Sequence, residues 1–234
     1  MKIIDLSRLI HGGMQVCPCD RQPVIEQYAT TDREGVNVKL VTMCTHTGAH
    51  IDAPSHGRND RPSIDQIPVE RFIGAGVLID LSDRWARYEI TPEDIRPYET
   101  LIEPGDFLIL NTGWGRHFGT PNFFNHPYLG REAAEYIASL GISLVATDGS
   151  SVDAAYGFAD ATQGGDKSFE EVLHSIDADN VKNDAHNVFF EHHMLIVEYI
   201  TNLDKISRQK ALYSFLPLLI QDADGSPIRA VCIE

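Results

Sequence analysis

Short runs of branched and aromatic residues recur along the chain and predict a protein built mainly from β-strands. Such residues favour the pleated surface of a sheet, and turn-forming residues separate the runs. The predicted strands are residues 2–6, 36–43, 76–81, 107–111, 142–147, 194–200, 212–220 and 228–233. No linker, internal repeat or low-complexity tract divides them, so we expect one domain over residues 1–234.

Helix signals lie between these strands. Thr91 and Pro92, followed by two acids, are typical of a helix N-terminus, with Thr91 as the cap. Residues 130–140 carry apolar side chains at a helical period, and Gly141 stands where such a helix ends. Because strands outnumber helices, the sequence predicts a mixed, β-rich α/β domain and not a doubly wound sheet.

A further short helix is predicted at residues 168–171, with Ser168 as its cap. The preceding pair Gly164 and Gly165 lacks the strand that must come before a phosphate-binding loop. We therefore interpret the pair as a flexible turn.

Composition limits the function classes. The 234 residues carry a formal net charge of -15, and so acidic a surface repels nucleic acid and anionic membranes. Charged residues interrupt the apolar N-terminus, which argues against a signal peptide, and no apolar run approaches the roughly 18 residues of a spanning helix. Four cysteines without a secretory signal are typical of reduced thiols, which favours a cytoplasmic protein.

The stretch CTHTGAHIDAPSHG places His46, His50, Asp52 and His56 within eleven positions. A catalytic divalent metal needs about three ligands from His, Asp or Glu and one position open for water. We expect His46, His50 and Asp52 to converge on one ion, with a solvated loop of unrelated histidines as the alternative. His56 is either a further ligand or a base that moves protons, for which its unperturbed pKa near 6.5 is suited.

The local conformation of this stretch is predicted from its spacing. Two positions apart in an extended segment, His50 and Asp52 would share a face. However, Gly48 and Pro54 argue against regular helix or strand. A tight loop that leaves the predicted strand 36–43 is the expected conformation.

A second cluster lies far downstream. Glu198 stands within the apolar run LIVEYI, where a buried carboxylate is costly unless its charge is compensated. A metal ion would compensate it, and so would a salt bridge to Lys or Arg. His186 precedes a helix-like turn in the same region and is a second candidate. His192 and His193 are also candidates, but adjacent side chains point apart in a loop or strand, so we expect at most one of them near the site and favour neither.

The pattern HTGAHIDAPSH, residues 46–56, resembles the signature of the cyclase family of metal-dependent hydrolases, which includes proteins like bacterial kynurenine formamidase and isatin hydrolase. The resemblance extends over most of the chain, through IIDLSRLIHGGM, IDQIPVERFIGAGVLIDLS, PGDFLILNTGW, HPYLGREAAEYIASLGISLVATDGSSVD and HHMLIVEYITNLDKI. It implies a β/β/α domain of the swivelling type, assembled as dimers or tetramers. It also implies a small-molecule substrate and two divalent ions, Zn or Mn.

The resemblance implies roles for individual residues. His46, His50 and Asp52 match the ligands of the first ion, and Asp52 also matches the carboxylate that bridges to the second. His186 and Glu198 match the remaining ligands of the second ion.

His56 matches the family's histidine for proton transfer. The resemblance therefore implies cleavage of a C–N amide bond, in a formamide or a lactam, by metal-activated water, with His56 passing the proton to the leaving group. The alternatives are a lactone hydrolase or cyclase of the same family, or a metal-binding protein that has lost catalysis.

Three departures from the family pattern bear on the substrate. Ala49 stands where relatives usually have Thr, Gly57 where an aromatic residue is common, and Cys17 where an aromatic residue lines the substrate pocket. Stacking on an aryl substrate is therefore not assured. Cys17 and Cys19 form a lone C-x-C pair, for which we favour a structural role over a metal site. We assign no substrate-binding residue, because five downstream aromatic residues fit a core as well as a pocket wall: Trp114, Phe118, Phe123, Phe124 and Tyr128.

Overall fold

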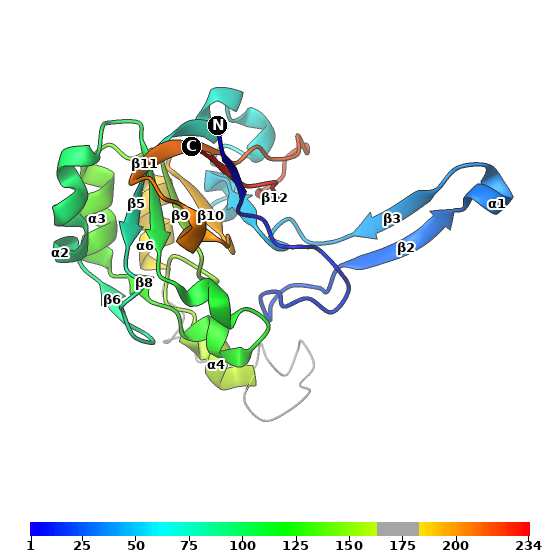
Figure 1. The fold of residues 1–234 in the computed structure, drawn as a ribbon, viewed down its shortest axis with the longest axis horizontal. Helices are drawn as coiled ribbons and strands as arrows, with labels where there is room; N and C mark the ends of the chain where they lie inside the picture. Colours follow the sequence, from blue (N-terminus) through cyan, green and yellow to red (C-terminus); the bar gives the residue numbers. More distant parts are fainter. Residues whose placement is uncertain (163–182) are drawn as a thin grey trace.

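The computed structural model describes residues 1–162 and 183–234, and most of its strands form one mixed sheet (Figure 1). The sheet strands are β1 Ile3–Asp5, β4 His50–Asp52, β5 Ile73–Asp80, β7 Phe107–Asn111, β9 Leu144–Thr147, β10 Leu195–Glu198, β11 Lys210–Ser214, β12 Gly225–Pro227 and β13 Val231–Ile233. They lie side by side in the order β1-β13-β11-β5-β7-β9-β10-β4-β12. The central strands β5, β7, β9 and β10 are parallel, and the flanking strands pair antiparallel.

Two further pairs of strands stand outside this sheet. They are β2 Val24–Ala29 with β3 Val38–Thr42, and β6 Glu89–Ile90 with β8 Tyr128–Leu129. The α-helices are α1 Thr31–Glu34, α2 Pro92–Ile95, α3 Arg131–Ser139, α4 Tyr156–Thr162 and α6 Asp184–Glu191. The short 3-10 helices are η1 Pro54–His56, η2 Ile64–Gln66, η3 Val69–Phe72, η4 Arg96–Leu101, η5 Trp114–His117, η6 Pro121–Asn125 and η8 Leu203–Lys205.

The central strands bury both of their faces, which explains their nearly continuous apolar sequences. In β7, Phe107 and Ile109 belong to one core cluster, and Leu108 and Leu110 belong to another. Apolar residues of α3 and α6 complete the second cluster. The sheet therefore lies between two hydrophobic layers, and the predicted β-rich α/β class is confirmed. No helix among residues 1–162 and 183–234 combines the length and the apolar character needed to cross a membrane.

Predicted helix signals agree with the structure where it describes them. α2 begins after Thr91, whose backbone N–H donates to the Asp94 carboxylate over 2.9 Å. α3 covers most of residues 130–140, and Gly141 follows it with a φ of 76°. The predicted helix at residues 168–171 and the turn at Gly164 and Gly165 lie outside the described residues.

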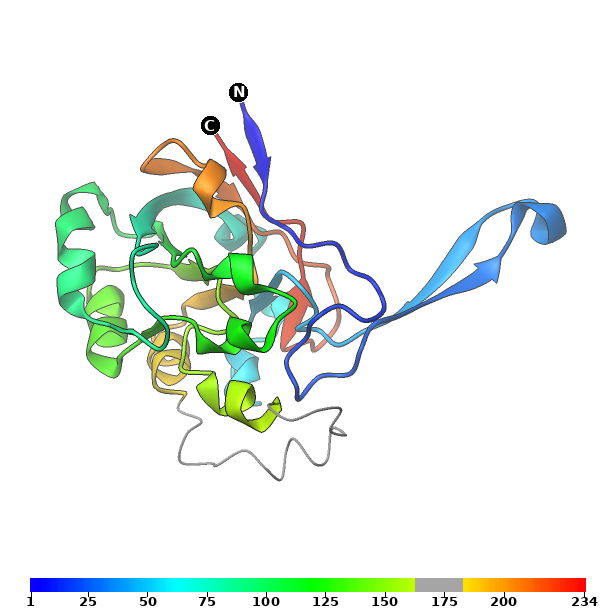
Figure 2. The ribbon, with the colours of Figure 1, turned by 60° about the horizontal axis from the view of Figure 1, so that its bottom comes forward.

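One strand prediction is wrong in part, and one strand, β2, was not predicted. The predicted strand 36–43 is a strand, β3, but it pairs with the unpredicted β2 and both project from the body of the protein (Figures 1 and 2). We call residues 24–42 the arm. The predicted strand 212–220 pairs with β5 only as far as Ser214, and Pro217, which has no N–H for a sheet ladder, lies just beyond it.

Candidate functional site

The short strand β4 places two of the predicted ligands on one face. It lies between β10 and β12, so the expectation that this stretch forms no regular strand is wrong for His50–Asp52. Alternation along the strand buries Ile51 in the core and turns His50 and Asp52 to the opposite face. In the register with β10, His50 lies opposite Glu198, which explains how residues so distant in sequence meet.

Two glycines make room for the loop that precedes β4. Gly48 has a φ of 70°, a conformation that favours glycine, and its carbonyl accepts a hydrogen bond from His50 Nδ1 over 2.8 Å. Gly225 in β12 lies opposite Asp52, and a Cβ on it would stand 2.9 Å from Cε1 of His46. The bare backbone at Gly225 therefore lets the His46 ring reach the site.

Helix α6 supplies the downstream histidine. His186 lies in its first turn, and the N–H groups of Ala185 and His186 donate to the Asp153 carboxylate over 2.8 and 3.0 Å. The same carboxylate accepts a hydrogen bond from His186 Nδ1 over 2.6 Å. Asp153 thus stabilises the helix N-terminus and orients the imidazole.

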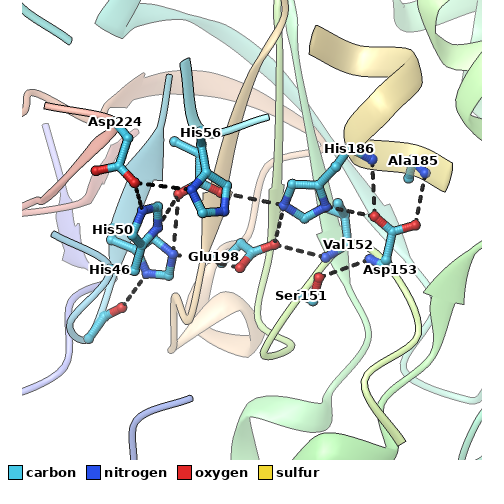
Figure 3. A network of polar contacts seen from close by, with 12 residues as sticks. His46, His50, His56, Ser151, Val152, Asp153, Ala185, His186, Glu198 and Asp224 are labelled. Atoms are coloured by element: carbon cyan, nitrogen blue, oxygen red, sulfur yellow. Dashed lines mark hydrogen bonds and ion pairs between the residues drawn. The ribbon is translucent and has the colours of Figure 1, made fainter. Parts of the chain in front are cut away.

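These elements bring the five predicted ligands together, with Asp52 shared by two groups of convergent ligand atoms. Figure 3 shows the four other ligands, His46, His50, His186 and Glu198, gathered in one place. Asp52 Oδ1 lies 2.7 Å from His46 Nδ1 and 3.4 Å from His50 Nε2, and Oδ2 lies 3.7 Å from His186 Nε2. Glu198 closes the cluster, 3.6 Å from His50 Nε2 and 3.5 Å from His186 Nε2.

The hydrogen bonds at the rim of the cluster indicate which ring nitrogens face its centre. His50 and His186 each donate through Nδ1 to an outer oxygen, and His46 Nε2 lies 3.0 Å from Asp224 Oδ2. Each ring therefore turns its other nitrogen, an acceptor when neutral, toward the Asp52 carboxylate. Although Asp52 is 1% exposed, no donor among the described residues reaches either of its oxygens with hydrogen-bond geometry. Imidazole nitrogens and a buried carboxylate that face one another without a donor between them are the arrangement expected of a site that binds a cation.

The pKa values within the cluster also indicate that it is suited to hold a cation. Burial and the neighbouring Asp52 raise the pKa of Glu198 to about 8, and burial lowers the pKa of His50 to about 4. Burial also lowers the pKa values of His46 and His186, but the carboxylates around them outweigh it and raise both pKa values well above the ordinary value. Without a cation, the cluster therefore holds protons to offset its negative charge.

His56 stands at the rim of the cluster, beside Asp224. Its Nδ1 lies 3.2 Å from Asp224 Oδ2, and its side chain is 38% exposed. The same carboxylate contacts His46 and accepts a hydrogen bond from the Thr45 hydroxyl over 2.9 Å. Sequence reasoning missed both Asp224 and Asp153, since nothing in the spacing separates either from the other acidic residues of the chain.

A cavity of about 350 Å³ opens onto this cluster. Cys17, Phe124, Phe190 and Tyr199 line it together with four of the site histidines and Glu198. Phe190 also explains Gly57, because a Cβ at that position would stand 2.7 Å from its ring. A larger cavity of about 660 Å³ lies elsewhere and contains none of the predicted site residues.

Several candidates fall outside the cluster. His192 and His193 are exposed at the end of α6, as expected. No Lys or Arg of the described chain forms an ion pair with Glu198, whose Oε1 accepts a hydrogen bond from the Val152 N–H over 3.0 Å. Of the five aromatic residues left unassigned, Trp114 and Phe123 pack in a core cluster, and Phe124 both packs there and lines the cavity.

Residues 4–154 match the family model for cyclases, described as "Putative cyclase". The chain belongs to the cyclase family. A curated relative in sequence is kynurenine formamidase of Bacillus anthracis, 29% identical over 233 residues, which are 98% of this chain and 96% of the relative. Among solved structures, isatin hydrolase A from Labrenzia aggregata bound to benzyl benzoate superposes with a TM-score of 0.82 at 24% identity, over 99% of this chain and 93% of that one. A "potential metal-dependent hydrolase with cyclase activity" superposes with a TM-score of 0.74 at 22% identity, over 99% and 96%. The predicted cyclase-family fold is therefore confirmed.

Proposed function

We propose that the chain is a metal-dependent hydrolase that cleaves the C–N amide bond of a small molecule, in a formamide or a lactam. The observation that carries this proposal is the Asp52 carboxylate, buried without a hydrogen-bond donor and faced by nitrogens of His46, His50 and His186. Membership of the cyclase family and the full-length likeness to a kynurenine formamidase support the reaction class.

We infer that two divalent ions, Zn or Mn, bind in the cluster. His46, His50 and Asp52 form one group of convergent ligand atoms, and Asp52, His186 and Glu198 form another. Histidine and carboxylate ligands suit either metal. When bound, such ions lower the pKa of water and polarise a carbonyl oxygen.

His56 is the proposed proton carrier. Its Nδ1 is held by Asp224, so Nε2 is the ring nitrogen available to accept a proton from the attacking water. The same nitrogen then delivers the proton to the leaving nitrogen of the substrate. Asp224 orients the ring, so that one carboxylate serves both His46 and His56.

The cavity walls suit a substrate with an apolar body. Phe124, Phe190 and Tyr199 exclude water from one side of the cluster and offer ring surfaces to the substrate. Cys17 lies among them, so these rings supply an aromatic wall although Cys17 itself is not aromatic. The four free cysteines of the chain fit a reducing compartment, and we infer that the enzyme acts in the cytoplasm.

The test combines metal analysis with a panel of substrates. After reconstitution with Zn or Mn, we expect bound metal and turnover of an N-formyl aryl amide or of isatin that exceeds turnover of a simple lactone. His192→Ala, a change outside the cluster, should behave as the wild type. Failure to bind either metal would overturn the proposal. Metal binding with preferred lactone turnover would favour the lactonase alternative, and metal binding without turnover would favour a binding protein.

A further inference from the structure

Two residues on the wall of the candidate cavity carry hydroxyl groups without a partner. Ser150 and Tyr199 both line the cavity of about 350 Å³. Ser150 is 8% exposed and Tyr199 is 2% exposed, yet neither hydroxyl forms a hydrogen bond with any described residue. A buried polar group without a partner costs free energy, so its presence in a native protein calls for an explanation. A molecule bound in the cavity can supply the missing partner.

The fold places these two residues next to each other. β9 and β10 are neighbouring parallel strands, and Ser150 and Tyr199 follow their carboxyl ends. The Tyr199 N–H donates to the Gly149 carbonyl over 3.0 Å, and the loop after β9 also contacts Glu198 through the Val152 N–H (Figure 3). Sheets with parallel strands commonly bind ligands outside the carboxyl ends of those strands. Both hydroxyls therefore belong to the end of the sheet that carries the proposed ligand Glu198.

The backbone of Tyr199 is held in a strained conformation. Its φ of 61° lies in the left-handed region, which a bulky side chain rarely adopts. The Tyr199 carbonyl accepts a hydrogen bond from Arg8 Nε over 2.9 Å, and the Arg8 guanidinium lies 4.1 Å from the centroid of the Phe118 ring. The Tyr199 ring packs against Phe123 and His50, with centroid distances of 5.1 and 5.6 Å. Strain that the surrounding contacts maintain in this way is typical of functional sites.

The charges on the cavity wall indicate which kind of group the hydroxyls would bind. Among the described residues that line the cavity there is no Lys or Arg, and Asp20 is an acidic residue of the wall outside the proposed ligand set. A substrate carboxylate in this part of the cavity would meet Asp20 without a cationic side chain to pair with it. Serine and tyrosine hydroxyls can each donate to an uncharged oxygen. The wall therefore favours a neutral acceptor.

We propose that Tyr199 and Ser150 donate hydrogen bonds to a neutral oxygen of the substrate that is separate from the scissile amide carbonyl. This inference rests on the proposed hydrolase function and narrows its substrate class to amides that carry a second, uncharged oxygen acceptor. A second fixed point on the substrate sets the direction in which the scissile bond meets the cluster. The two residues position the substrate and take no part in bond cleavage.

The test compares two aryl formamides on the full chain reconstituted with metal. Formanilide has only the scissile amide, whereas ortho-formamidoacetophenone adds a neutral ketone oxygen. Tyr199→Phe and Ser150→Ala should each lower kcat/KM for ortho-formamidoacetophenone by about 3- to 10-fold, the usual effect of losing one neutral hydrogen bond. Both variants should leave kcat/KM for formanilide unchanged.

A third probe tests the charge of the acceptor. The carboxylate ortho-formamidobenzoate should have a lower kcat/KM with the wild type than ortho-formamidoacetophenone. A higher value would overturn the assignment of a neutral acceptor.

Tyr213→Phe provides the matched control, since Tyr213 of β11 is 0% exposed and does not line the cavity. It should leave kcat/KM unchanged for both formamides. Tyr199→Phe and Ser150→Ala should also keep the Tm of the wild type, because neither hydroxyl has a partner among the described residues. A lowered Tm with equal losses on both formamides would show a structural role and overturn the inference.

Two further outcomes separate the inference from the function on which it rests. If the wild type cleaves the formamides and both variants match it on ortho-formamidoacetophenone, the inference fails and the proposed function stands. If the metal-loaded wild type cleaves none of the three probes, the amide hydrolase function fails and the inference fails with it.

Discussion

At the residue scale, two carboxylates outside the proposed ligand set orient its histidines. Asp153 holds His186 through Nδ1, and Asp224 contacts both His46 and His56. A carboxylate that engages one ring nitrogen sets the tautomer and increases the basicity of the other. The orientation of these ligands and of the proposed proton carrier therefore depends on residues outside the ligand set.

Replacing His56 separates proton transfer from metal binding. We expect His56→Ala to lower kcat by about 10²–10⁴-fold, the usual contribution of a general acid–base group, and to retain the bound metal. Steady-state kinetics and elemental analysis of the same preparation measure both quantities. His192→Ala is the control because this histidine lies outside the cluster. Loss of metal from His56→Ala would make His56 a ligand and not a proton carrier.

Replacing Asp153 tests the orientation of His186. Asp153→Asn keeps an oxygen that can accept from the N–H groups of α6 but removes the charge beside the imidazole. We expect about 10–100-fold weaker metal binding, measured by competition with a chromophoric chelator. Asp160→Asn, which alters a surface ion pair with Arg87, should leave affinity unchanged. Equal affinities for both variants would argue against a role for Asp153 in the metal site.

Sequence reasoning identified the proposed ligands but not these supporting carboxylates. Three of the proposed ligands stand together in one short stretch, which is unusual for a packed core or a surface loop. Glu198 is a carboxylate inside an apolar run, which is unusual for a buried strand. Both features can be seen in the sequence alone. Asp153 and Asp224 have no such signal. Their roles arise only when the fold places them within hydrogen-bond distance of an imidazole.

At the element scale, some strands could be predicted from the sequence and others could not. Apolar runs such as residues 107–111 predicted the central strands, because strands buried on both faces must be apolar throughout. β2 was missed because VIEQYA mixes polar and apolar residues, and five of its six residues are exposed, so burial imposes no alternating pattern on it. β4 was missed because Gly48 and Pro54 enclose only five residues. Three of them form the strand, and their pairing with β10 and β12 is decided by contacts far away in sequence.

The cap of α2 offers a test of local stability. Asp94 accepts hydrogen bonds from Thr91, Tyr88 and Arg84, and its side chain is 4% exposed. Asp94→Ala should lower the free energy of unfolding by about 2–3 kcal/mol, because it removes charge-assisted bonds and a helix cap. Urea unfolding at neutral pH measures the loss. Asp83→Ala, which alters an exposed partner of Arg84, should stay within about 0.5 kcal/mol of the wild type.

The effect of Asp94 should depend on pH in a defined direction. Burial raises the pKa of this carboxyl, but the hydrogen bonds outweigh it and hold the pKa below 3.8. Its stabilisation is therefore complete above pH 3.8 and is lost as the pH falls through the folded-state value. The difference between wild type and Asp94→Ala should shrink in acid. A difference that grows in acid would contradict the assignment.

At the scale of the whole molecule, the candidate metal site joins parts of the chain that lie far apart. Its residues come from the loop before β4, from β4 itself, from α6 and from β10, so only the folded protein brings them together. A ligand that binds only the native state stabilises it by mass action. Bound metal should therefore stabilise the entire domain and not only the site.

Metal removal tests this linkage. At a free metal concentration of about 100 times Kd, stabilisation amounts to about 2.7 kcal/mol, which is roughly 5–11 °C in Tm for a chain of this size. A chelator should lower the Tm of the wild type by that order, whereas Asp52→Asn, which removes the charge shared by both ligand groups, should show little response.

Calorimetry should also detect proton release on binding, because His46 and His186 have raised pKa values and hold protons at neutral pH in the metal-free protein. Affinity should consequently rise with pH. Equal chelator effects on wild type and Asp52→Asn would mean that the metal stabilises the protein from another place, and the cluster around Asp52 would lose its assignment.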